Sequence, residues 1–153
     1  MPSFLPVLFI RSKGLRKLYS QMLAPLLENF HLTQLELDII LFLANNPGYD
    51  TARDIVELRH LSKSHVSVGV DSLAGRGLLE RSYQAGNRKT IHLRLLPAAD
   101  GIVAAGREVQ QQYGETLFRG FSQAQREELV QLLDRISRNV DSALANQEER
   151  TEE

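Results

Sequence analysis

The sequence predicts a mostly helical protein that contains one two-stranded β hairpin. Three observations lead to this fold class. Apolar residues recur every three or four positions up to about residue 75 and again after residue 97, as in amphipathic helices. Between residues 79 and 96 the period changes to two, which is typical of strands. Thr or Ser precedes several helical segments in the place of an N-cap.

The first helix is expected over residues 7–27, and Pro25 is expected to bend or fray its end. A second helix is expected to begin after Thr33, because Glu36 three residues later completes a capping-box pattern. The segment "NNPG" ends this helix. The apolar stripe of the first helix consists of Leu8, Leu15, Leu18 and Met22. That of the second helix consists of Leu35, Ile39, Phe42 and Leu43.

A short helix follows in "DTARDIVELRHL", where Thr51 is the expected cap and Ile55 and Leu58 are expected to point inward. The next helix lies in "SKSHVSVGVDSLAGRGLLER", with Ser62 as its N-cap and Gly75 and Gly77 at its end. Its buried face is predicted from the spacing i, i+4 and i+7 to hold Val66, Val70 and Leu73.

The hairpin is predicted from "LLERSY" and "TIHLRLL", with a turn at Gly86-Asn87 and a basic tip at Arg88 and Lys89. A long helical region resumes after Pro97 and is interrupted near "RGFS", so that Ser122 becomes the N-cap of the last helix. That helix carries a continuous apolar stripe of Leu129, Leu132, Leu133, Ile136, Val140 and Leu144.

A short helix, a tight turn, a second helix and a basic hairpin together form a winged helix-turn-helix. The expected domains are a winged helix-turn-helix over 34–97, a helical dimerisation region over 1–33 and 98–146, and a disordered acidic tail over 147–153. Burial of the valine and leucine face leaves the polar front of the second helix free to enter a DNA groove. The expected DNA-binding residues are Ser62, Lys63, Ser64, His65, Ser67, Val68, Arg88 and Lys89.

Charge is distributed unevenly along the chain, whose net charge is −1. Residues 51–94 carry +4 and residues 95–153 carry −5, so the predicted DNA-binding segment is the basic part. Absence of Cys excludes disulfides and thiolate zinc sites. The histidines form no ligand set and no catalytic or phosphate-loop motif is present, so we expect no cofactor, no metal and no enzymatic activity.

The apolar start "FLPVLFI" is short and its basic residues follow it, which is the wrong order for a secretory signal. No stretch approaches the roughly 18 apolar residues of a membrane span. We therefore expect a soluble cytoplasmic protein with no membrane partner.

The chain resembles the MarR family of bacterial transcription regulators over roughly residues 8–144. The resemblance rests on the segments "LTQLELDIILFL", "LSKSHVSVGVDSLAGRGLLER" and "GNRKTIHLRLLPAA". It implies a homodimer held by the first and the last two helices, a palindromic double-stranded DNA operator, and an effector crevice between the dimerisation helices and the winged-helix lobe.

The chain also departs from the family pattern. The wing usually has Asp-x-Arg, where this chain has Asn87 and Lys89 with Arg88 between them. A basic residue often follows the central Ser or Thr of the recognition helix, where this chain has Val68, and a common Gln in the second helix is replaced near Glu36. These changes bear on DNA affinity and base readout more than on the fold.

A dimer is also expected from the apolar stripes of the first and last helices. These stripes lie outside the winged-helix unit, and a monomer would leave much of their apolar surface exposed to solvent. The alternative is that these stripes pack on each other within one chain. The expected interface residues are Leu8, Leu15, Leu129, Leu133, Ile136 and Val140.

A small aromatic or amphipathic effector is implied by the resemblance, and Arg16, Tyr19, His31 and Tyr49 are candidates to line its crevice. The function expected is therefore a dimeric, sequence-specific DNA-binding transcriptional regulator, a repressor that a small molecule releases. The alternative is a winged-helix protein-interaction module with weak or lost operator binding.

Overall fold

The computed structural model describes the backbone of residues 4–151 and the side chains of residues 12–146. It confirms the predicted fold class, a mostly helical chain with a winged helix-turn-helix and a two-stranded antiparallel wing. The elements in chain order are α1 (Phe4–Phe30), α2 (Gln34–Asn45), α3 (Ala52–Arg59), α4 (Lys63–Gly75), β1 (Leu79–Gln84), β2 (Asn87–Leu95), the 3-10 helix η1 (Pro97–Ala99), α5 (Asp100–Leu117) and α6 (Gln123–Thr151).

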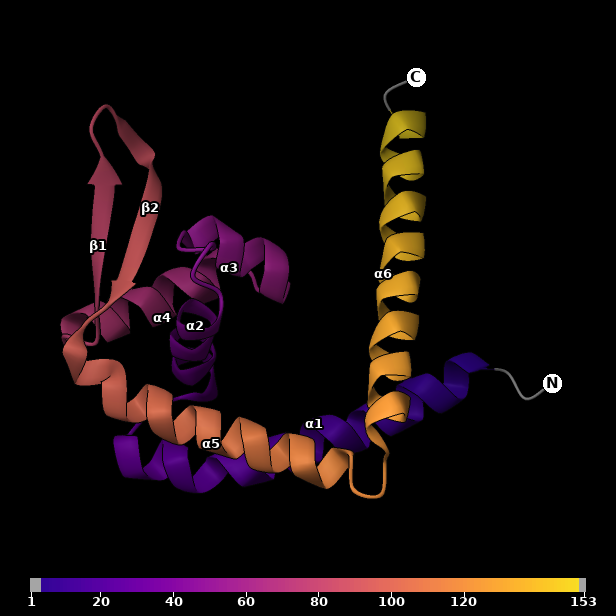
Figure 1. Ribbon diagram of the computed structural model, residues 1–153. Coiled ribbons are helices and arrows are strands. Elements are labelled where there is room, and N and C mark those ends of the chain that lie inside the picture. The colour runs from indigo at the N-terminus through magenta and orange to yellow at the C-terminus, as the bar shows by residue number, and fades with distance from the viewer. Residues whose placement is uncertain (1–3, 152–153) are drawn as a thin grey trace. The chain divides into compact units, whose positions relative to one another are not determined.

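The chain divides into two compact units between Tyr113 and Gly114. The first holds α1 to α4, the hairpin and most of α5. In this unit α1 and α5 run side by side, α2 packs across them, and α3, α4 and the hairpin lie on the other side of α2 (Figure 1). The second unit holds the end of α5 and all of α6. The predicted domain boundaries at residues 33/34 and 97/98 stay a prediction.

The helix starts form where the sequence places capping residues. Thr33 accepts a hydrogen bond from the Glu36 amide at 3.2 Å, and the Glu36 carboxylate accepts one from the Thr33 amide at 2.7 Å. Thr51 forms the same reciprocal box with Asp54 at the start of α3. Side-chain caps of this kind satisfy amides that would otherwise lack a partner.

Helix α2 is the centre of the core and is buried on more than one face. Its predicted stripe residues Ile39 and Phe42 are buried, and so are Leu37, Ile40 and Leu41, which lie outside that stripe. These residues are buried because α1, α4, α5 and β2 approach the helix from different sides. The amphipathic pattern of the sequence underestimates burial in a helix surrounded in this way.

Two glycines allow neighbouring helices to approach α2 closely. A Cβ added at Gly69 of α4 would lie 2.6 Å from Ile39 Cδ1 and 3.3 Å from Leu35 Cγ. A Cβ added at Gly106 of α5 would lie 2.7 Å from Leu41 Cδ2. A glycine in mid-helix costs about 1 kcal/mol relative to alanine, and here it removes a steric clash between packed helices.

Glu36 carries the one buried carboxylate among the described side chains, at 6% exposure. It accepts hydrogen bonds from the Ser72 hydroxyl of α4 and from Thr33, and the Arg76 guanidinium lies 4.0 Å from it. Burial alone would raise the pKa of Glu36, but the hydrogen bonds from Ser72 and Thr33, with the charge of Arg76, lower it below its ordinary value. The carboxylate therefore ties the start of α2 to the C-terminal half of α4.

Two local expectations for the helices are corrected. Helix α1 continues through Pro25 to Phe30, because proline removes only one amide donor and the packed Leu23 and Leu26 hold the last turns on the core. Among the described side chains of α1, Leu23 and Leu26 are buried, and the stripe residue Leu15, which is assigned to the dimer interface, is 45% exposed in the single chain. Leu58 is 50% exposed instead of buried, because the core covers α3 only as far as Val56 and residues 57–59 at its end are all exposed.

Helix α6 continues to Thr151 and so covers most of the 147–153 segment that the sequence predicts to be a disordered acidic tail. Glu, Gln and Arg, which fill this segment, are good helix formers. Its start matches the prediction, since the Ser122 hydroxyl accepts from the Gln125 amide at 3.2 Å.

Candidate nucleic-acid interface

Helix α4 presents a solvent-exposed face at its N-terminal half. Ser62 caps the helix, with its hydroxyl accepting from the His65 amide at 3.2 Å. The predicted stripe of Val66, Val70 and Leu73 is buried, so the remaining positions of the first turns face solvent. The exposed candidates on or beside this half of the helix are Ser62, Lys63, Ser64, His65, Ser67 and Val68.

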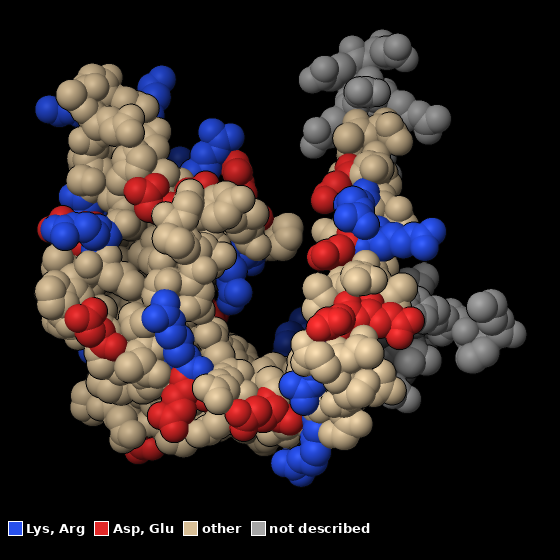
Figure 2. Space-filling model, in the orientation of Figure 1, with Lys and Arg blue, Asp and Glu red and all other residues tan. Residues whose placement is uncertain are grey.

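The tip of the wing is built by Asn87 rather than by an ion pair. Its side-chain oxygen accepts from the Lys89 amide at 3.0 Å, and its amide nitrogen donates to the Thr90 hydroxyl at 3.2 Å. Gly86 takes a φ of 80°, which completes the two-residue turn. Arg88 and Lys89 are both exposed, and basic side chains stand clear of acidic ones at the tip on the face shown in Figure 2.

The base of the wing is fastened to the loop before α3. The Leu93 amide donates to the Asp50 carbonyl at 2.7 Å, and Thr51 forms an isolated β bridge with His92. The His92 ring nitrogen Nδ1 lies 3.1 Å from both carboxylate oxygens of Asp50. This anchor was not predicted from the sequence, where the alternation of His92 with apolar residues indicates only a strand residue that faces solvent.

An ion pair links the wing to α4. Arg81 of β1 donates from its guanidinium to the carboxylate of Asp71, which lies on α4. Asp71 would otherwise place an unpaired negative charge on the helix that carries the candidate DNA contacts. On the same hairpin Arg94 pairs with Glu80 across the strands at 2.6 Å. Arg81 is a second residue that the sequence reasoning missed, because its partner lies 10 residues away on a different element.

Three of the candidate DNA-binding residues lie around one cavity. Lys63 and Ser67 of α4 and Lys89 of the wing line a cavity of about 390 Å³ between α3, α4 and the hairpin. Its apolar lining includes Val56 of α3, and Arg53 lies at the same cavity, paired with Glu57 at 2.7 Å. The structure therefore brings the two predicted DNA-contacting elements to the same side of the winged-helix unit.

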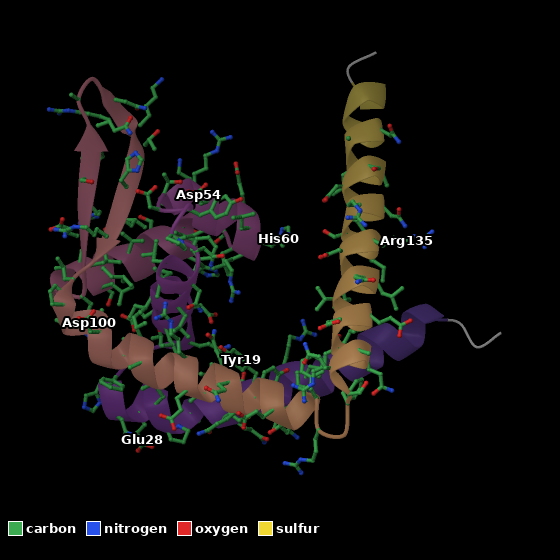
Figure 3. All side chains as sticks on the ribbon, viewed as in Figure 1. Tyr19, Glu28, Asp54, His60, Asp100 and Arg135 are labelled. Carbon is green, nitrogen blue, oxygen red and sulfur yellow. The ribbon has the colours of Figure 1, made fainter. Side chains whose placement is uncertain are left out.

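A second cavity, of about 380 Å³, lies between α1, α2, the end of α3 and α5. Two of the predicted effector residues, Arg16 and Tyr19, line it, and Figure 3 labels Tyr19 among the helices of this unit. The Tyr19 and Tyr113 rings lie 5.0 Å apart, and both residues line the cavity. Arg59 lies 3.5 Å from Asp38 in the same cavity. Burial raises the pKa of Asp38, while the charge of Arg59 acts in the opposite direction.

The other two predicted effector residues lie elsewhere. His31 follows the end of α1 at a φ of 51°, and its carbonyl accepts from Arg76 at 2.9 Å. Tyr49 lines a different cavity, between the end of α2 and the hairpin. Arg16 and Tyr19 share a helix face because they are three residues apart, and no such spacing joins them to the other two.

The predicted dimer-interface residues of α6 are accessible in the single chain. Leu133, Ile136 and Val140 are 55%, 45% and 50% exposed, and Leu129 is half-buried. Leu8 lies in α1, but its side chain is outside the described residues. Helix α6 thus carries an apolar stripe that the described residues of its own unit leave uncovered.

Within the described residues no group of three or more acidic or histidine side chains is placed to hold a metal ion. None of the described helices is long and apolar enough to cross a membrane.

Comparison with known proteins confirms the resemblance to the MarR family. Residues 31–89 match the sequence model of the MarR family. This segment covers α2 to α4 and the first part of the hairpin. No curated protein sequence matches the chain.

Solved structures share the fold over nearly the whole chain. The transcriptional regulator PA3341 has a TM-score of 0.78 at 22% identity and covers 92% of this chain and 99% of its own. A MarR family regulator from Listeria monocytogenes, solved with a 26-mer DNA, has a TM-score of 0.75 at 14% identity, and the match covers 92% of this chain and 90% of the regulator. BpsR of Bordetella bronchiseptica, whose DNA binding is regulated by 6-hydroxynicotinic acid, has a TM-score of 0.66 at 19% identity, and the match covers 85% of this chain and 98% of BpsR.

Proposed function

We propose that this chain, which has the winged helix-turn-helix fold of MarR family transcriptional regulators, is a dimeric, sequence-specific DNA-binding regulator. Its main support is the exposed N-terminal half of α4 together with the exposed Arg88 and Lys89 of the wing on one winged-helix unit. The α4 face enters the major groove, where Ser62 at the helix start lies near a phosphate and the residues after it reach base edges. The wing tip contacts the neighbouring minor groove or the backbone. The Listeria regulator of similar fold was solved with DNA, which agrees with this role.

The dimer forms through the uncovered apolar stripe of α6 and the first helix. The stripe residues Leu133, Ile136 and Val140 are about half exposed in the single chain, and a second copy related by a two-fold axis buries them. Such a dimer presents two recognition helices to half-sites roughly 34 Å apart, one turn of DNA. The operator is therefore a palindrome.

We propose further that the regulator is a repressor and that a small aromatic or amphipathic anion releases it. The cavity beside α1 combines aromatic Tyr19 with the cationic Arg16 and Arg59, which suits an aromatic carboxylate. Arg59 is the last residue of α3 and stands three residues before Ser62, the cap of α4. An anion that competes with Asp38 for Arg59 thus acts on the segment that positions α4.

Replacement of Arg88 by alanine is expected to weaken binding to all duplexes about 10-fold. The side chain is exposed at the wing tip and serves as a phosphate or minor-groove contact. Because each dimer loses two contacts, the slope of log affinity against log salt is expected to fall by about 2. Fluorescence anisotropy with the duplex upstream of the gene and a scrambled duplex, at several salt concentrations, measures both quantities.

Arg138→Ala is the matched control, because it removes the same charge from an exposed position on α6. It is expected to leave affinity and salt slope unchanged. An unchanged slope in Arg88→Ala would remove the wing tip from the interface. Failure of the wild-type protein to bind any duplex at low salt would instead favour the protein-interaction alternative.

Binding of an aromatic carboxylate is expected to raise the melting temperature of the protein. At 100 times the dissociation constant the ligand adds about 2.7 kcal/mol, or roughly 5–10 °C for a chain of this size. A thermal-shift series with 6-hydroxynicotinic acid and related aromatic carboxylates measures it. Arg16→Ala is expected to abolish most of the shift, whereas Arg138→Ala keeps it. A shift that survives Arg16→Ala would place the effector outside the α1 cavity.

A further inference from the structure

Val68 is an apolar side chain at the centre of the proposed DNA-reading face. It lies in the middle of α4, on the side opposite the buried Val66 and Val70. It is 66% exposed, the largest exposed fraction among the large hydrophobic residues that the described part of the chain leaves exposed. Neither helix propensity nor core packing accounts for valine there, because alanine is the better helix former and the side chain has no core neighbours.

Three of the polar side chains around Val68 are engaged inside the protein, whereas His65, three residues before it, is exposed to solvent. Ser64, four residues before it, lies 3.1 Å from the Ser62 hydroxyl. Asp71, three residues after it, accepts from Arg81, and Ser72, four residues after it, donates to Glu36. Since residues three and four apart are neighbours on a helix, these groups surround Val68 on its own face.

Two of the neighbouring side chains are also short. Ser64 and Ser67 extend little beyond the helix backbone, so the helix can approach the floor of a groove until Val68 touches it. Asp71 and Arg81 neutralise each other beside this point. Val68 is thus a small apolar contact bordered by the neutralised pair of Asp71 and Arg81 on one side and by the exposed His65 on another, unlike the basic wing tip.

The major groove displays hydrogen-bond donors and acceptors on every base pair, and one apolar group, the C5-methyl of thymine. Valine neither donates nor accepts a hydrogen bond, so the group that it complements is this methyl. We propose that Val68 is a specificity-determining residue that selects thymine at one position in each half-site of the operator, by contact with the 5-methyl group. This inference rests on the proposed DNA-binding function and adds the chemistry of the base that is read.

The test uses the full-length protein and a duplex selected by it from random sequence. Each thymine of that duplex is replaced in turn by uracil, which pairs identically and lacks only the methyl group. A methyl group buried at an interface is worth about fourfold in affinity, so one thymine per half-site is expected to lose about fourfold, and the symmetric pair about 15-fold. The same series is measured with Val68→Ala, which keeps the helix and removes the contact.

The expected result is that uracil at the critical position weakens the wild-type protein and leaves Val68→Ala unaffected. Thymines elsewhere in the duplex serve as controls and are expected to tolerate uracil. Tight, sequence-selective binding without any methyl dependence, or a methyl dependence that persists in Val68→Ala, would overturn the inference while the proposed function stands. Selection of no duplex at all would overturn the proposed function and the inference with it.

Discussion

Substitution of glutamate for both Leu133 and Ile136 is expected to convert the proposed dimer to a monomer and to lower operator affinity by about 1000-fold. The two side chains are 55% and 45% exposed in the single chain and lie on one face of α6. In a two-fold dimer the change buries four carboxylates without partners, which costs several kcal/mol, and each 1.4 kcal/mol is a factor of ten. Sedimentation equilibrium measures the association, and anisotropy with the selected operator measures the affinity.

Gln131→Glu with Ser142→Glu is the matched control for charge and helix propensity. Both positions are exposed on the opposite side of α6 from the stripe, so this variant is expected to stay dimeric and to bind normally. A dimer that survives the change at Leu133 and Ile136 would show that the interface lies on another surface.

Replacement of Glu36 by alanine is expected to lower the free energy of unfolding by about 3 kcal/mol. The change removes half of the capping box of α2, worth about 1 kcal/mol, and the hydrogen bond to Ser72 of α4, worth about 2 kcal/mol because the acceptor is charged. It also leaves Arg76 without its nearby carboxylate. Urea denaturation at fixed protein concentration measures the loss.

The pH dependence of stability follows from the same carboxylate. The pKa of Glu36 is lower in the folded chain than in the unfolded one, so the folded state favours its ionised form. Its contribution is complete above the unfolded pKa and is lost as the pH falls through the folded pKa. Stability of the wild-type protein is therefore expected to fall in acid more steeply than that of Glu36→Gln, which keeps an acceptor at the cap.

Glu28→Ala, which removes an exposed carboxylate from α1, is expected to change stability by no more than about 0.5 kcal/mol. An equally small effect of Glu36→Ala would mean that the contacts to Ser72 and Arg76 contribute little to the fold.

Local elements were predictable because each depends on residues close in sequence. The caps at Thr33, Thr51 and Ser62 require only a side chain and an amide three residues ahead, and all three form. The turn at Gly86 and the buried stripe of α4 follow from backbone conformation and from helical spacing in the same way.

Parts of the candidate site were not predictable because their partners are distant in sequence. The anchor of the wing joins His92 to Asp50, and the charge balance on α4 needs Arg81 of the next element. His31 and Tyr49 were grouped with Arg16 and Tyr19 by residue type, but the cavity beside α1 includes only the second pair. Residue type indicates what chemistry is present, whereas packing determines which groups meet.

The order of helices and strands, the caps, the buried stripe of α4 and the basic wing can all be derived from the sequence, because they depend on interactions within a few residues. Three features become visible only in the folded chain: α2 is buried on several faces, Gly69 lets α4 approach it, and Glu36 joins α2 to α4. These features depend on which surfaces meet after folding. The hydrophobic effect favours burial of apolar surface but has no preferred direction, so the sequence pattern is compatible with many different pairings of the apolar helix faces. Close packing without overlap selects one of them.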